Sequence, residues 1–154
     1  MSNPSICHTF YTAFQNKDYE TMQNLYDDEA IFSDAAFQNL NALEVRAMWE
    51  MLIKRGKDLV LEYEVLEESE HFGKVRWVAT YSFSKTGRKV VNVINARMKF
   101  IDGKIMEHYD DFDFYKWGRQ AFGFTGSMIG WTSFFQNKVR SQARKQLLRF
   151  MDKK

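Results

Sequence analysis

The stretch Asp102–Asp113, which reads DGKIMEHYDDFD, decides the fold because it predicts a tight turn followed by a strand. Asp-Gly between two runs of alternating apolar residues is a strong hairpin signal, since Gly accepts the positive φ that the turn requires. Side chains two apart share a strand face, so one face is predicted to carry Met106, His108, Asp110 and Phe112. If that face looks into an apolar interior, the His and the Asp would change each other's pKa. Such a pair is a candidate for acid–base chemistry.

The segments before this stretch predict the rest of the sheet. From residue 59 the apolar residues recur with a period of two, in runs at 59–66, 75–83 and 89–100 separated by polar turns. Together with the strand after Gly103, these runs imply an antiparallel meander joined by short turns.

Helical spacing dominates the N-terminal third of the chain. A first helix is predicted to start at Asn3-Pro4, a second is capped by Asp18, and a third starts at Asn41 with Glu44 three residues on. A short strand at 30–33 separates the second helix from the third and places Asp34 at its end. Three helices followed by a meander predict an α+β fold with the helices on one sheet face.

Beyond the meander, residues 116–154 predict a helical extension to the domain formed by residues 1–115. Gly123, Gly126 and Gly130 would let this arm turn sharply and cover the mouth of the domain or a partner subunit. The last helix combines an apolar stripe with seven Lys or Arg after position 137 against one Asp. Such a helix can lie on an anionic surface, but we expect the stripe to pack on the same domain and the charges to stay in solvent.

The composition limits the classes of partner. The chain has 154 residues and a net charge of +2, so neither nucleic acid nor a membrane is expected as a partner. Its single cysteine, Cys7, excludes an internal disulfide and fits a reducing compartment. With no secretory signal and no long apolar run, we expect a cytoplasmic protein. Aromatic residues make up 16% of the chain, which suits either a well-filled core or the walls of an apolar cavity.

Three short motifs carry a resemblance to a known superfamily. They are Asn16–Glu20 (NKDYE), Leu25–Asp34 (LYDDEAIFSD) and Phe100–Ile105 (FIDGKI). Their order and spacing resemble the nuclear-transport-factor-2-like superfamily, in particular its SnoaL-like and ketosteroid-isomerase-like branch with a C-terminal helical extension. The resemblance implies a cone: a curved, mostly antiparallel sheet with mixed pairing at its edge, wrapped around the three helices. It also implies a ligand pocket at the open end and a homodimer through the convex sheet face.

The same resemblance assigns roles to individual positions. Asp34 falls where ketosteroid isomerases hold their general base. The oxyanion hole of those enzymes needs a Tyr in the first helix and a protonated Asp on the penultimate strand. Here Phe10 takes the place of the Tyr, with Tyr11 beside it, and Ala96 or Asn95 takes the place of the Asp. Steroid isomerisation by that mechanism is therefore not expected.

Three ionisable residues are the candidates for catalysis: Asp34, His108 and Asp110. Asp34 is either a base in a pocket or a strand-end carboxylate that caps a turn. His108 suits proton transfer because the pKa of a free His lies near neutrality, but it also fits a buried structural pair with Asp110. The spacing resembles no known metal site, so neither a metal nor an organic cofactor is expected.

Substrate-binding residues are predicted among the inward-facing aromatic and apolar side chains, with Asn92 and Tyr11 as donors to a developing oxyanion. The remaining candidates are Phe10, Phe14, Trp49, Tyr63, Trp77, Met106 and Phe112. Two functions stay open. One is an isomerase, cyclase or hydrolase acting on a hydrophobic small molecule, and the other is a non-catalytic ligand-binding or dimerisation module.

Overall fold

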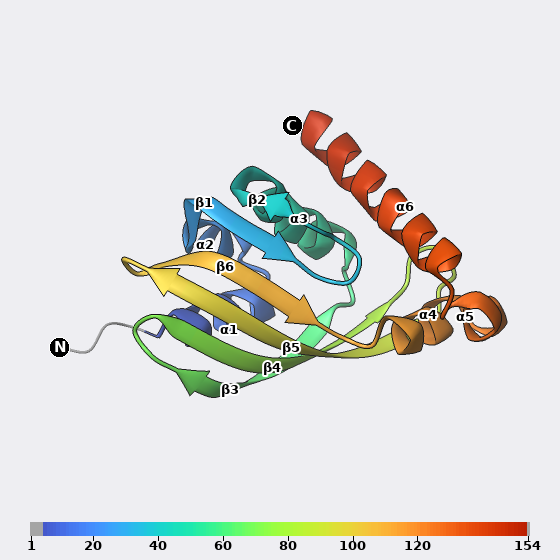
Figure 1. Ribbon diagram of the computed structural model, residues 1–154, viewed down its shortest axis with the longest axis horizontal. Helices are drawn as coiled ribbons and strands as arrows, with labels where there is room; N and C mark the ends of the chain where they lie inside the picture. The colour runs from blue at the N-terminus through green and yellow to red at the C-terminus, as the bar shows by residue number, and fades with distance from the viewer. Residues whose placement is uncertain (1–4, 154) are drawn as a thin grey trace.

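The computed structural model describes residues 5–153 and shows a curved sheet with helices packed against one of its faces (Figure 1). The strands are β1 (Tyr26–Ser33), β2 (Leu40–Asn41), β3 (Val60–Glu68), β4 (Phe72–Ser82), β5 (Lys89–Ile101) and β6 (Lys104–Asp111). The helices are α1 (Ile6–Gln15), α2 (Tyr19–Asn24), α3 (Ala42–Arg55), α4 (Phe114–Phe122), α5 (Phe124–Ile129) and α6 (Ser133–Asp152).

The sheet runs in the order β2-β1-β6-β5-β4-β3. Strands β3 to β6 form the predicted antiparallel meander, whereas β1 pairs with β6 in parallel and with β2 in antiparallel fashion. At the turn before β6, Asp102 has a φ of 51° and Gly103 a φ of 76°, as a two-residue hairpin turn requires. The α+β fold and the curved, mixed sheet are therefore confirmed.

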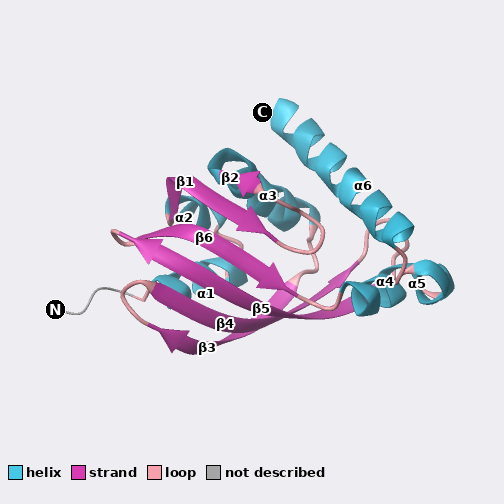
Figure 2. Ribbon diagram, in the orientation of Figure 1, coloured by secondary structure: helices cyan, strands magenta, loops and turns pink. Residues whose placement is uncertain are grey.

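Capping side chains explain where the first three helices start. Asp18 accepts a hydrogen bond from the Thr21 N–H, and Asn41 forms a reciprocal capping box with Glu44, both as predicted. The predicted start of the first helix, Asn3-Pro4, lies outside the described residues, and the structure begins α1 at Ile6 after a Ser5 cap. These helices bury their apolar sides against the sheet and lie behind it in the view of Figure 2.

Strand β1 is longer than the sequence pattern suggests. It begins at Tyr26, whereas the expected strand covers only residues 30–33. Its pairing with β6 shifts register between Tyr26 and Ile31. This irregularity breaks the simple alternation that would have marked a strand, which is why the pattern concealed its first half.

A bulge in β6 overturns the predicted face of Met106. Phe100 pairs with Ile105 and Lys99 pairs with Glu107, so Met106 is an extra residue between two paired positions. Ile105 is fully buried beneath the sheet, while Met106 is only partly buried. A bulge reverses the side-chain alternation on one side of it, so His108 and Asp110 face inward as predicted but Met106 does not.

The extension forms three helices at one end of the sheet, from which α6 runs back toward α3 (Figure 1). A close approach of α4 and α5 requires Gly126, because a Cβ there would lie 2.0 Å from the Gly118 carbonyl oxygen. Leu147 of α6 is fully buried in the main core, and Arg144 forms a 2.8 Å ion pair with Glu44 of α3. The basic helix thus contacts the main core through Leu147 and α3 through Arg144. Within residues 5–153, the helices are too short or too polar to cross a membrane.

Candidate active site

An apolar cavity of about 570 Å³ lies between the sheet, α3 and the C-terminal helices. Its walls come from segments far apart in the chain, because the sheet curves around α1 and α3 while α4, α5 and α6 enclose the remaining side. The aromatic part of the lining includes Phe14, Trp49, Trp77, Tyr81, Phe112, Trp117 and Phe135. Such a lining favours a hydrophobic small molecule over a charged one.

Two carboxylates interrupt this apolar lining, those of Asp34 and Asp110. The parallel strands β1 and β6 bring them together, because Ser33 pairs with Tyr109 and each Asp is the next residue along its own strand. Both side chains also border a polar hollow on the other side of the sheet, lined in part by Arg97. The two acids therefore lie where the apolar cavity meets a polar opening.

The surroundings of Asp34 favour its protonated form near neutral pH. Burial raises its pKa from 3.8 to about 7, and the negative charge of Asp110 acts in the same direction. Its Oδ1 accepts hydrogen bonds from the N–H groups of Phe37 at 2.6 Å and Ala36 at 2.8 Å, which oppose that rise. Asp34 therefore caps the turn after β1 and also faces the cavity, so the two alternatives raised by the sequence coexist.

Asp110 is held by a chain of buried polar groups that reaches α3. Its Oδ1 lies 2.9 Å from Nε2 of His108, and Nδ1 of His108 lies 2.8 Å from the Tyr26 hydroxyl. The indole N–H of Trp49 donates to the same hydroxyl at 2.9 Å. His108 and Tyr26 are at most 1% exposed, so water does not compete for these hydrogen bonds.

The number of hydrogens on each group determines which groups donate and which accept along this chain of hydrogen bonds. The Trp49 indole can only donate, so the Tyr26 oxygen accepts from it and the Tyr26 hydrogen is available for Nδ1 of His108. His108 then carries its own proton on Nε2 and donates it to Asp110. This arrangement gives every donor an acceptor and leaves Asp110 as the final acceptor at the edge of the cavity.

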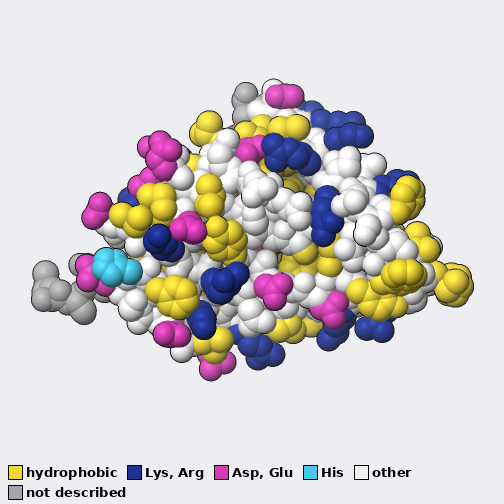
Figure 3. Space-filling view, in the orientation of Figure 1, with side chains coloured by type: hydrophobic (Ala, Val, Ile, Leu, Met, Phe, Trp, Pro, Cys, Tyr) yellow, Lys and Arg dark blue, Asp and Glu magenta, His cyan; other side chains and the backbone are white. Residues whose placement is uncertain are grey.

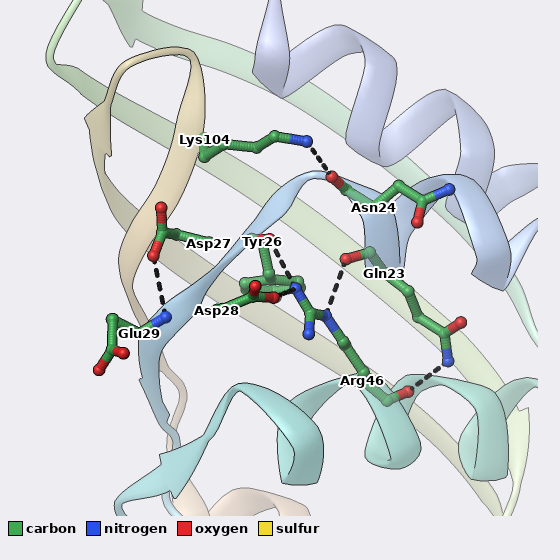
Figure 4. A network of polar contacts seen from close by, with 8 residues as sticks. All are labelled: Gln23, Asn24, Tyr26, Asp27, Asp28, Glu29, Arg46 and Lys104. Carbon is green, nitrogen blue, oxygen red and sulfur yellow. Dashed lines mark hydrogen bonds and ion pairs between the residues drawn. The ribbon is translucent and has the colours of Figure 1, made fainter.

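The backbone of Tyr26 is fixed from outside the core by Arg46 of α3 (Figure 4). The Arg46 guanidinium donates to the carbonyl oxygens of Tyr26 at 2.8 Å and Gln23 at 3.1 Å, and it pairs with Asp28 at 2.9 Å. The Gln23 side chain returns a hydrogen bond to the Arg46 carbonyl oxygen at 2.9 Å. Arg46 therefore fastens the start of β1 to α3, so that the Tyr26 ring enters the core beside His108.

Two buried donors near the cavity are not satisfied by the protein. The indole nitrogen of Trp77 and the hydroxyl of Tyr11 have no hydrogen-bonding partner within residues 5–153. Trp77 lines the cavity, and so does the buried amide of Asn92 on β5. Burial and the charge of Asp110 raise the pKa of Tyr11 well above its usual range, so this phenol stays neutral.

The structure brings seven of the twelve predicted site residues to the cavity wall: Phe14, Asp34, Trp49, Trp77, Asn92, Asp110 and Phe112. His108 is fully buried and reaches the cavity only through Asp110. Phe10 and Tyr11 are also fully buried, and Phe10 packs edge-on against the His108 ring at 5.7 Å.

Two further predicted positions lie away from the cavity. The Tyr63 hydroxyl lies 2.8 Å from the Thr12 hydroxyl, where β3 meets α1. Met106 occupies the bulge in β6. Five of the predicted substrate contacts or catalytic groups therefore do not line the cavity, namely Phe10, Tyr11, Tyr63, Met106 and His108.

Sequence reasoning missed Tyr26 and the contribution of the C-terminal helices. Tyr26 precedes a run of three acidic residues, which made it resemble the end of a helix rather than the start of a strand. Trp117, Phe135 and Val139 line the cavity from α4 and α6, and Trp117 also donates a 2.8 Å hydrogen bond to Tyr81. The helical stripe indicated that these residues are inward-facing, but it gave no sign of which surface they cover.

The described residues hold no recognisable metal centre. Within residues 5–153, His, Cys, Asp and Glu side chains do not gather in groups of three or more that would suit a metal ion.

Solved structures of similar fold include several small-molecule enzymes and enzyme candidates. A LEH-like epoxide hydrolase from M. tuberculosis is 14% identical, with a TM-score of 0.60 over 82% of this chain and 93% of that one. IdmH, a polyketide cyclase candidate from Streptomyces antibioticus, is 18% identical, with a TM-score of 0.60 over 74% and 94%. AclR, a hydroxylase candidate from Streptomyces galilaeus, is 19% identical, with a TM-score of 0.58 over 70% and 75%. At these identities the likeness establishes the fold alone.

The family is established by a different comparison. No curated protein sequence is significantly similar to this one. Residues 8–108, which make up more than half of the chain, match the SnoaL-like domain. The match runs from α1 to the middle of β6 and includes Tyr26, Asp34 and His108. We conclude that this chain belongs to the SnoaL-like domain family.

Proposed function

We propose that this protein is an enzyme that moves protons on a hydrophobic small molecule, in an isomerase-, cyclase- or hydrolase-type reaction. The observation that carries the proposal is the placement of Asp34 and Asp110 side by side in the wall of one apolar cavity. Two carboxylates with different environments can take the roles of acid and base in the same step. The names of the structural relatives, an epoxide hydrolase and polyketide cyclase candidates, support chemistry of this kind.

In this proposal Asp110 is the base. The hydrogen bond from His108 at 2.9 Å holds one oxygen of its carboxylate, which leaves the other free to accept a proton from the substrate or from a water molecule. His108 does not touch the substrate and is therefore a positioning residue, and Tyr26 and Trp49 orient it in turn.

Asp34 is the acid. Its pKa of about 7 keeps a large fraction protonated at neutral pH, and its Oδ1 is engaged by the turn that follows β1. The proton on its other oxygen can be donated to a substrate oxygen as negative charge develops there. Asn92 and Trp77 supply further N–H groups in the same wall. One proton leaves the substrate to Asp110 and one reaches it from Asp34, so the step is balanced.

The test begins with the molecule that occupies the cavity in protein purified from cells, identified by mass spectrometry after extraction. Turnover of that molecule and of related hydrophobic epoxides and ketones is then compared between the wild type and Asp110→Asn. We expect the variant to lose at least about a hundredfold in kcat, the usual size of a general-base contribution. The matched control is Asp111→Asn, since Asp111 is the next residue along the strand and is exposed.

The alternative is a ligand-binding module without catalysis, which the apolar cavity alone would also support. Tight binding of the extracted molecule with no turnover of any compound in the panel would favour that function. Equal turnover by the wild type and Asp110→Asn would contradict the assignment of the base. The pH dependence separates the roles of the acids, because activity that needs protonated Asp34 falls as the pH rises through about 7.

We also propose an oligomeric state and a cellular location for this protein. A homodimer through the outer sheet face rests on the family resemblance, and the exposed Val91 and Ile101 of β5 are available for it. Sedimentation velocity measures its molar mass directly. A cytoplasmic location rests on the lone, buried Cys7, which fits a reducing compartment.

A further inference from the structure

Five large apolar side chains stand in solvent within eleven residues of the C-terminal extension. They are Phe124 (81% exposed), Met128 (59%), Ile129 (39%), Trp131 (69%) and Phe134 (76%). We call this set the apolar tip. It occupies α5 and the start of α6, and Figure 3 shows apolar side chains gathered at that end of the molecule. A contiguous group of this kind on a soluble surface marks a contact with a partner or a membrane.

The C-terminal extension that carries the apolar tip is strongly basic. Residues 114–154 contain nine Lys or Arg and a single Asp, while residues 1–113 contain 13 Lys or Arg against 19 Asp or Glu. The Arg88 guanidinium lies against Gly123 at the start of α5, and Arg119 stacks on Tyr115, whose hydroxyl bonds to the carbonyl of Ser127 in α5. The tip is therefore framed by cations, and its partner should be anionic.

The apolar stripe of α6 is not available for the same contact. Phe135 and Leu147 are buried, so this helix cannot lie flat on a surface with its apolar side down. The tip is a separate feature that projects from the end of the molecule. The Trp131 indole N–H is bonded to the Met128 carbonyl oxygen at 3.2 Å, so the ring meets a partner without an unsatisfied donor.

The apolar tip is also continuous with the cavity. Ile129 and Phe134 belong to the tip and line the cavity as well, together with Lys138 one turn further along α6. A hydrophobic molecule that leaves a surface touching the tip can therefore enter the cavity along apolar side chains. This continuity favours a lipid surface as the partner, because a bilayer can supply a hydrophobic ligand to the cavity.

We propose that the apolar tip docks on an anionic lipid surface. Phe124, Trp131 and Phe134 insert among the headgroups, where aromatic rings are favoured, and the surrounding Lys and Arg side chains bind the lipid phosphates. The docked protein presents its cavity entrance to the bilayer and takes up a hydrophobic ligand from it. The docking itself does not depend on catalysis by Asp34 and Asp110.

Trp131 provides a direct readout, because it is the exposed member of the four tryptophans, while Trp49, Trp77 and Trp117 are at most 9% exposed. Full-length protein is titrated with phosphatidylcholine vesicles, with and without phosphatidylglycerol, and tryptophan emission is recorded. We expect a blue shift with the phosphatidylglycerol vesicles that is absent in Trp131→Phe. The apparent affinity should fall steeply between 0.1 M and 1 M salt, where the Debye length shrinks from about 10 Å to about 3 Å.

Phe134→Ser should weaken vesicle binding about tenfold, as expected for loss of one inserted aromatic side chain. Leu43→Ser, which removes a side chain that is 69% exposed on α3, is the matched control and should bind as the wild type does. Trp131 emission that no vesicle changes would overturn the proposal. So would emission that is blue-shifted without lipid in a dimer that Phe134→Ser dissociates, because the tip would then be a contact between copies of the chain.

Discussion

The hydroxyl of Tyr26 lies 2.8 Å from Nδ1 of His108, although 82 residues separate them along the chain. The contact exists because β1 runs parallel to β6, with Phe32 beside His108, and because Arg46 fixes the backbone at the start of β1. The two rings are nearly parallel, with centroids 6.1 Å apart. The position of Asp110 in the cavity wall therefore depends on β1, β6 and α3 together.

Tyr26→Phe should lower the free energy of unfolding by about 1–3 kcal/mol, because it leaves the buried indole N–H of Trp49 without its acceptor. Urea denaturation measures the loss. Tyr63→Phe is the control, since the Tyr63 hydroxyl bonds to Thr12 at an exposed site and its loss should stay below about 1 kcal/mol. Equal losses in the two variants would mean that the buried chain of hydrogen bonds adds nothing to stability.

Asp34 should make the protein less stable as the pH rises from about 4 to 7. In this interval the folded protein keeps the Asp34 proton, because its pKa is about 7, while the unfolded chain releases it near 3.8. The unfolded state thus binds fewer protons, and the free energy of unfolding falls by at most about 1.4 kcal/mol with each pH unit. Above about pH 7 both states are ionised and the effect is constant.

The variant Asp34→Asn isolates this effect, since the amide oxygen can still accept the backbone hydrogen bonds of Ala36 and Phe37. Its stability should match the wild type near pH 4 and exceed it by about 2–4 kcal/mol at pH 8. Urea denaturation across that range gives the difference. A gap that stays constant with pH would show that the pKa of Asp34 is not raised. Asp111→Asn, at an exposed position, should show no such trend.

The fold was largely predictable because its signals are local. The Asp102–Gly103 turn, the Asn41–Glu44 capping box and the two-residue period of the meander each act within a few positions, and the structure confirms all three. Placement of β1 beside β6 is different, because it joins segments about 80 residues apart. The family resemblance implied only mixed pairing at the edge of the sheet, and local pattern did not identify the two strands.

The site was predictable only in part, for two physical reasons. First, the inward face of a strand is not the same as the cavity wall, and Phe10 and Tyr11 face inward but are covered by other core side chains. Second, one side of the cavity is formed by α4, α5 and α6, whose path depends on close contacts such as that of Gly126 with Gly118. A helical stripe shows which residues are buried and leaves open what buries them.

Two neighbouring leucines test whether α6 is part of the main core. Leu147 is fully buried there, whereas Leu148 is 43% exposed. Leu147→Ala should therefore lower the free energy of unfolding by about 2–5 kcal/mol, and Leu148→Ala by less than about 1 kcal/mol. Both variants keep the helix propensity of the segment, so chemical denaturation compares burial alone. Equal losses would mean that α6 does not pack on the core in solution.

The bulge in β6 makes a prediction opposite to that of simple alternation. Alternation turns Met106 inward and Ile105 outward, whereas the register places Ile105 opposite Phe100 and buries it completely. Ile105→Ala should then cost about 2–5 kcal/mol of unfolding free energy, and Met106→Ala should cost clearly less, because its side chain is only partly buried. The comparison needs only two denaturation curves. A larger loss in Met106→Ala would contradict the bulge and would favour the uninterrupted strand, in which Met106 faces inward together with His108 and Asp110.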